Sequence, residues 1–131
     1  MFANSRLISE IFAFSILFFM GCRESPEMAG FDTELWISDK SGCGSVRNGL
    51  AGKIIDAKDK LLGEKESWVI RALGKPDRSD LYKRNQKFLI YYLEPGPDCP
   101  DQVSNPGMLI IRFNATGYCN EVFLQRGFST R

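Results

Sequence analysis

The chain has 131 residues, of which 44% are hydrophobic and 25% charged, and its 17 basic and 16 acidic side chains give a formal net charge of +1. This length fits one domain, and the two signs of charge are interspersed, so the sequence lacks the basic stripe that typically binds nucleic acid. The chain has no histidine, which removes the commonest general base and the commonest metal ligand.

Residues 1–21 have the pattern of a signal peptide. A short polar start precedes an apolar run over residues 11–21, well below the roughly 18 apolar residues that a membrane-spanning helix needs. The run ends at Gly21-Cys22, which matches the last two positions of the bacterial lipobox. We therefore predict cleavage before Cys22 and acylation of Cys22, with chains such as palmitate. The alternatives are a buried helix of the fold and an uncleaved anchor.

Acylation of Cys22 would determine where the protein resides. Each buried methylene contributes about 0.8 kcal/mol, so two or three acyl chains hold a soluble domain durably at a bilayer. Residues 22–30 contain proline and glycine, and we predict a flexible tether. Arg23 follows the cysteine, where an aspartate would retain some lipoproteins in the inner membrane. We expect a bacterial envelope protein anchored to the outer membrane rather than the inner one.

Two helices are predicted at the start of the domain, which spans residues 31–131. Apolar residues recur at helical spacing over residues 45–62, with charged residues on the other side. A shorter helix fits residues 66–73, and the glycine and proline that follow would end it. Asp32 is suited to cap a short turn of helix ahead of both.

The pattern changes beyond Pro76 from helical spacing to alternating or continuous apolar residues. Strands are predicted over residues 88–93, 108–113 and 121–125, with a short opening strand at residues 81–82. Because the strands follow the helices, we predict an α+β fold. Two N-terminal helices would pack on a three- or four-stranded antiparallel sheet, in the order ααβ(β)ββ.

Nine positions between residues 61 and 117 follow a recognisable pattern: a glycine, an apolar residue, Leu-Gly-x-Pro, a tyrosine-rich strand and a strand ending in F-x-x-x-G. They are Gly63, Ile70, Leu73, Gly74, Pro76, Tyr91, Tyr92, Phe113 and Gly117. This pattern resembles the SmpA/OmlA family, which includes the small lipoprotein of the outer-membrane β-barrel assembly machinery. The resemblance also implies a fold related to that of β-lactamase inhibitory protein.

A second pattern, a tryptophan followed by Asp-x-x-Gly-Cys-x-x-x-Arg, precedes the first predicted helix. Its positions are Trp36, Asp39, Gly42, Cys43 and Arg47. It is most similar to small bacterial lipoproteins whose function is uncharacterised. The combined resemblance covers residues 31–126, and its motifs consist of capping and packing residues, so it specifies fold better than activity.

Three cysteines remain after Cys22, and an exported protein meets an oxidising compartment, so one disulfide is expected. Cys119 is predicted at the end of the sheet opposite the loop that carries Cys99. A strand of roughly 20 Å separates these ends, which exceeds disulfide reach. Cys43 and Cys99 both lie in loops, and we predict that they pair and that Cys119 stays reduced and partly buried. A reactive Cys43 thiol is disfavoured because no histidine is present to activate it.

The loop over residues 94–107 contains four prolines and three acidic residues. Long loops in compact domains are often binding loops, and the candidate partner-binding residues are Glu94, Pro95, Asp98 and Asp101. The equal alternative is a solvated crossover that proline and the disulfide keep rigid. Elsewhere, Trp68 and one tyrosine of the pair at residues 91–92 are predicted to belong to the core.

No nucleophile, acid–base pair or metal-ligand cluster is recognisable in the sequence, so we predict a non-enzymatic protein without a cofactor or metal. The lipid anchor and the family resemblance imply an envelope module that binds a protein partner, in outer-membrane assembly or maintenance. The alternative is an inhibitor or sensor that binds an envelope enzyme.

Overall fold

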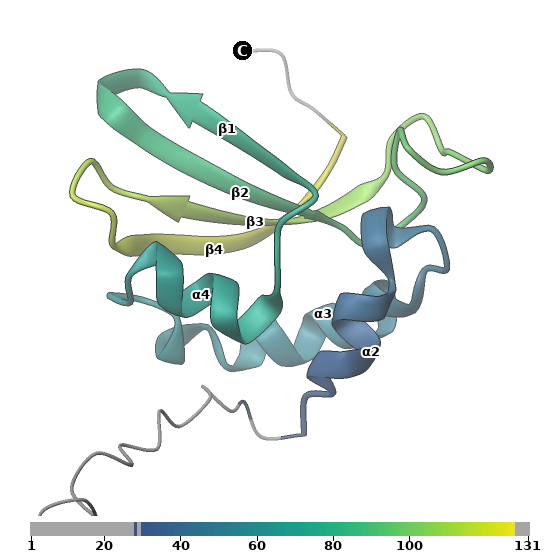
Figure 1. Ribbon diagram of the computed structural model, residues 1–131, viewed down its shortest axis with the longest axis horizontal. Helices are drawn as coiled ribbons and strands as arrows, with labels where there is room; N and C mark the ends of the chain where they lie inside the picture. Colours follow the sequence, from purple (N-terminus) through teal and green to yellow (C-terminus); the bar gives the residue numbers. More distant parts are fainter. Residues whose placement is uncertain (1–27, 29, 128–131) are drawn as a thin grey trace, which may run out of the picture.

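The computed structural model describes residue 28 and residues 30–127, which form a four-stranded antiparallel sheet with helices packed on one face (Figure 1). The predicted α+β class, with helices preceding an antiparallel sheet, is confirmed. No helix within these residues is long and apolar enough to cross a membrane. The α-helices are α2 (Thr33–Ser38), α3 (Val46–Asp56) and α4 (Glu66–Leu73), and the strands are β1 (Arg78–Tyr82), β2 (Gln86–Tyr92), β3 (Gly107–Phe113) and β4 (Cys119–Arg126).

The described residues contain three α-helices, whereas the sequence predicted two. The additional helix is α2, the turn that Asp32 was expected to cap, and the Asp32 side chain accepts a hydrogen bond from the Leu35 N–H at 3.1 Å. The predicted first helix is also shorter than expected. It ends at Asp56, and the chain continues as a tighter 3₁₀ turn, η3 (Lys58–Lys60), before Leu61 enters the core.

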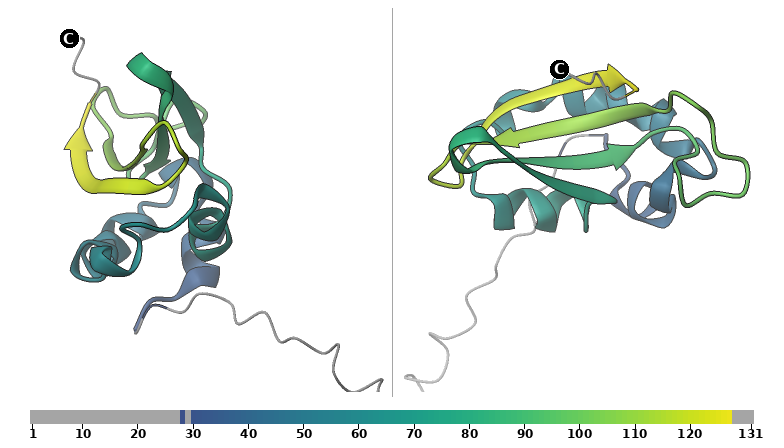
Figure 2. Two further views of the ribbon diagram at one scale, coloured as in Figure 1. Left: turned by 90° about the vertical axis from the view of Figure 1, so that its left-hand side faces the viewer. Right: turned by 90° about the horizontal axis from the view of Figure 1, so that it is seen from above.

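The sheet is a meander in the order β1-β2-β3-β4, with every neighbouring pair antiparallel. The predicted opening strand is β1, so the sheet has four strands. Two views at right angles to Figure 1 show that the sheet is twisted and that the helices lie on one face only (Figure 2). No helix among the described residues covers the other face of the sheet.

Apolar side chains are buried on both faces of the sheet because successive strand residues point to opposite sides. Tyr91 faces the helices, where its ring centroid lies 5.8 Å from that of Trp36, whereas Tyr92 is buried on the opposite face. Both tyrosines are therefore buried, where the sequence predicted one. Trp36 is the fully buried tryptophan, and Trp68, which was predicted to be core, only packs against the core from its partly exposed position.

The turn between β1 and β2, η4 (Lys83–Asn85), contains two non-glycine residues in the left-handed conformation, Arg84 and Asn85, each with φ of 59°. Such a conformation costs a residue with a side chain about 1–2 kcal/mol, and glycine avoids most of this cost.

We expect Arg84→Gly to raise the free energy of unfolding by up to about 1 kcal/mol, because relief of the backbone strain exceeds the chain entropy that glycine adds. Urea unfolding followed by circular dichroism measures this change. Lys83→Gly is the matched control, since φ of Lys83 is not positive, and it should leave stability unchanged or lower it. A destabilised Arg84→Gly variant would contradict the expectation.

Candidate functional site

The buried guanidinium of Arg47 joins the helical layer to the sheet. Arg47 is 2% exposed; its Nε donates a hydrogen bond to the Trp36 carbonyl at 2.8 Å, and its Nη1 lies 2.6 Å from Asp77 Oδ2 and 3.4 Å from the Tyr92 carbonyl oxygen. The guanidinium carbon also lies 5.0 Å from the ring centroid of Trp36 and 5.8 Å from that of Tyr91, within the range of cation–π attraction. One side chain thus contacts α2, β2 and the segment after α4.

Two aspartates complete this arrangement, which we call the Arg47 cluster. Ser45, the N-cap of α3, provides no side-chain cap, and Asp39 supplies one instead. Both oxygens of Asp39 and both oxygens of Asp77 accept hydrogen bonds from backbone N–H groups at 2.7–3.1 Å. The donors are Ser41, Gly44, Arg47 and Tyr92. Because each of the four carboxylate oxygens accepts a backbone N–H, the cluster holds these backbone segments in place.

Gly42 allows the chain to approach the end of β2 closely. Its φ is +65°, and a Cβ atom at this position would lie 2.6 Å from the Glu94 carbonyl oxygen and 2.8 Å from that of Tyr92. Only glycine fits both the conformation and the space. The approach brings Cys43 to a Cα–Cα distance of 5.5 Å from Cys99, and the two form a disulfide. The predicted pairing is confirmed.

The four candidate residues of the loop over residues 94–107 are not equivalent. Glu94 Oε1 accepts a hydrogen bond from the N–H of the first residue of β3 at 2.9 Å and forms an ion pair with Arg126 at 2.7 Å. Pro95 is partly buried, whereas Asp98 and Asp101 are exposed. Glu94 therefore holds the base of the loop, and the two aspartates are the acidic residues that a partner can reach.

The face of the sheet opposite the helices, hereafter the uncovered face, carries a second apolar cluster. Its central residues are at most 5% exposed, and two phenylalanines pack against them while remaining partly exposed. A Cβ atom on Gly96 would lie 2.8 Å from the ring of Tyr92, so the loop covers one end of this cluster. The central residues are Ile90, Tyr92, Met108 and Ile110, and the phenylalanines are Phe88 and Phe123.

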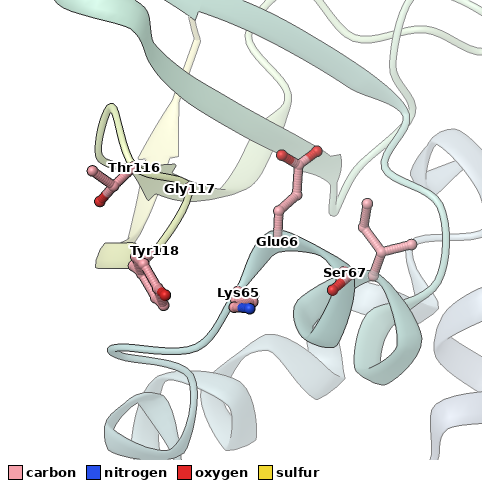
Figure 3. A pocket seen from close by; sticks show the side chains of 7 residues that line it. Lys65, Glu66, Ser67, Thr116, Gly117 and Tyr118 are labelled. Carbon is pink, nitrogen blue, oxygen red and sulfur yellow. The ribbon is translucent and has the colours of Figure 1, made fainter.

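A shallow hollow of about 540 Å³ lies between the start of α4 and the turn before β4 (Figure 3). Glu66 points toward the sheet, away from Lys65, and forms an ion pair with Lys87. The Glu66 N–H, one of the unpaired groups expected at a helix start, donates to the Gly117 carbonyl at 3.2 Å. The hollow therefore offers neither an acid–base pair nor a free first N–H group for an anion.

Cys119 is free, as predicted, and at 3% exposure it is more deeply buried than the partly buried position expected from the sequence. Burial raises the pKa of its thiol to about 11, which disfavours the thiolate that acts as nucleophile or metal ligand. Within the part of the chain that the structure describes, no group of three or more histidine, cysteine or acidic side chains is placed to hold a metal ion. The predicted lipidation site, Cys22, lies outside the described residues.

Comparison of the chain with protein-family models, with curated proteins and with solved structures found no match. The resemblance to the SmpA/OmlA family therefore remains a prediction, and a proposal for function depends on the geometry described above.

We expect Arg47→Met to lower the free energy of unfolding by about 3–5 kcal/mol, because it leaves the Asp77 carboxylate buried without its cation. Chemical denaturation measures the change. Arg71→Met is the matched control, since Arg71 is exposed on α4, and it should shift stability by less than about 0.5 kcal/mol. Equal stability of the two variants would show that the Arg47 cluster does not hold the layers together.

Cys119 should react slowly with iodoacetamide at pH 8 while the protein is folded. With a thiol pKa of about 11, about one molecule in a thousand carries the thiolate at that pH, and burial restricts access further. In urea, where the pKa returns to its ordinary value, alkylation should be rapid. Mass spectrometry of the peptide that contains Cys119 follows both reactions, and rapid alkylation of the folded protein would contradict this expectation.

Proposed function

We propose that this protein is a lipid-anchored, non-enzymatic module of the bacterial cell envelope that binds another protein through the uncovered face of its sheet. The observation that carries the proposal is the second apolar cluster on that face. Antiparallel sheets that face water usually carry polar residues on the solvated side, whereas this face carries a buried apolar centre with a partly exposed apolar rim. Phe88 and Phe123 supply the accessible apolar area.

The position of the N-terminal segment supports this role. The described chain enters the domain at α2, on the helical side of the molecule and opposite the uncovered face (Figure 1). Phe31, just before α2, packs against the core on that side. Eight residues separate Cys22 from Phe31, and an extended chain covers at most about 3.5 Å per residue. A lipid on Cys22 would hold the helical layer near the membrane and turn the uncovered face away from it.

The family resemblance supports a partner in outer-membrane assembly or maintenance. The alternative role, an inhibitor or sensor of an envelope enzyme, is favoured by a different observation. Glu94 joins the two ends of the loop over residues 94–107 by its bond to the Gly107 N–H, and the disulfide at Cys99 holds the loop between them. Asp98 and Asp101 remain exposed. A preorganised loop loses little conformational entropy on binding, which suits an inhibitor.

A crosslinked pull-down of the full-length protein from its native membranes, with partners identified by mass spectrometry, tests the proposal. Phe123→Ser should abolish recovery of the partner because Phe123 lies on the uncovered face. Leu124→Ser is the matched control, because Leu124 is 50% exposed and lies on the other side of the same strand. Cys22→Ala should release the protein from the membrane and weaken recovery.

If Phe123→Ser still recovers the partner, and a variant with Asp98 and Asp101 replaced by asparagine does not, the result would contradict the proposal and support the inhibitor role. A membrane-extracted protein that starts at residue 1 and carries no lipid would overturn the anchor.

A further inference from the structure

Strand β1 forms one edge of the sheet, and no other strand among residues 30–127 pairs with its outer side. Natural proteins usually protect such edges with charged side chains, proline or covering segments, because an open edge accepts further strands. On β1, Leu81 is 82% exposed, the highest value among the large apolar side chains described, and Tyr82 is 48% exposed. This edge therefore combines unpaired strand backbone with accessible apolar side chains.

The opposite edge, β4, is protected differently. Its Glu121 lies 3.3 Å from Arg112, and its Arg126 lies 2.7 Å from Glu94, so charged side chains in ion pairs flank the strand. Charged residues on an edge disfavour the addition of another strand. Strand β1 also carries an ion pair, between Arg78 and Asp80 at 2.8 Å, in its first half. The accessible apolar side chains Leu81 and Tyr82 lie beyond this pair, so the second half of β1 is the part of the two edges that is open to a partner.

The side chains of β1 connect this edge to the uncovered face. The Tyr82 ring lies 5.4 Å from the ring of Phe88, edge to face, at the rim of the second apolar cluster. Leu81 is paired in register with Lys87 and points to the opposite side of the sheet. An added strand would place alternate side chains against Leu81 on one side and Tyr82 on the other, which is how strand addition combines backbone hydrogen bonds with side-chain selectivity.

The charges next to β1 indicate the chemistry of the partner. Lys83 and Arg84 are exposed directly after the strand, and the ion pairs formed by described residues involve neither of them. These two cations favour a partner segment that carries acidic residues beside them. Arg84 also keeps its charged side chain at a backbone conformation that glycine would adopt at lower cost, and such strain concentrates where a side chain contacts a ligand.

We infer that β1 binds an extended segment of a partner protein as an added strand, with apolar side chains at alternate positions and acidic residues beside Lys83 and Arg84. The five residues of β1 match a partner segment of similar length, roughly 17 Å. The inference rests on the proposed function only in that the domain binds proteins.

Amide hydrogen exchange of β1 in the full-length protein, in detergent, tests the inference. The probe is a synthetic peptide of about nine residues, with alternating valine and threonine in the middle and two acidic residues at each end. A counterpart with lysine in place of every acid is the control. At a concentration ten times its Kd, the acidic peptide should slow exchange of the outward-facing amides over residues 78–82 about tenfold, whereas the lysine peptide should not.

Arg84→Gly removes the cation and also relieves backbone strain. Weaker binding by this variant would therefore reflect the lost charge and not a loss of stability. The variant should keep the fold and weaken binding of the acidic peptide by about fivefold, as expected for loss of one exposed charge pair. Leu81→Ser should weaken binding as well, whereas Leu124→Ser on the opposite edge strand should not.

Unchanged exchange of β1 with the acidic peptide, or equal slowing by both peptides, would overturn the inference. The remaining candidate is an anionic lipid surface. The test is hydrogen exchange in micelles doped with phosphatidylglycerol. If these micelles slow exchange over residues 83–85 and the acidic peptide has no effect on β1, the two cations contact lipid and the inference is overturned. In either case, loss of the native partner by Phe123→Ser would leave the proposed function standing.

Discussion

The buried ion pair between Arg47 and Asp77 is the interaction on which the arrangement of the two layers depends. A buried pair of this kind adds little net stability over an apolar pair of the same size, because both charges lose their hydration. The pair instead fixes the relative positions of three elements, because Arg47 lies on α3, Asp77 follows α4, and both contact the end of β2. A shift of either helix against the sheet would leave a buried charge unsatisfied, which disfavours other packings of the same elements.

The disulfide and the loop follow from the same constraint. Asp77 accepts the Ser41 N–H, so the segment that precedes α3 is held against β2. Gly42 leaves no room for a Cβ beside the Glu94 carbonyl oxygen, and Cys43, the next residue, forms the disulfide with Cys99. The covalent bond thus secures a contact that the Arg47 cluster already specifies, and the loop over residues 94–107 is fixed at the edge of the uncovered face.

The sequence predicted those features that depend on local periodicity. Helical spacing located α3 and α4, alternation located the strands, and the separation of the sheet ends left Cys43 and Cys99 as the pair. The role of Asp77 was not predicted, because its partners lie 30 residues away on α3 and 15 residues away on β2 and no local pattern records such contacts. The sequence singled out Arg47 only as a position of the pattern that begins at Trp36, and its burial against Trp36 and Tyr91 reveals its role. The burial of Trp36 in place of Trp68 has the same cause, since α2 packs through a contact distant in sequence.

The apolar character of the uncovered face is visible in the sequence. Residues 88–93 are apolar at every position, as in strands buried on both faces, yet the three helices cover only one face of the sheet. The loop covers one end of the second cluster. Phe88 and Phe123 are partly exposed at its rim, and Tyr82, beside Phe88, is 48% exposed. The same rim ends at β1, whose outer side no described strand occupies. The apolar side chains on this face exceed what the described helices cover, and Tyr82 extends the rim to the end of β1 away from its Arg78–Asp80 ion pair. A partner strand at β1 would therefore cover both the unpaired backbone and the adjoining apolar rim, which relates the surface of this protein to the proposed binding role.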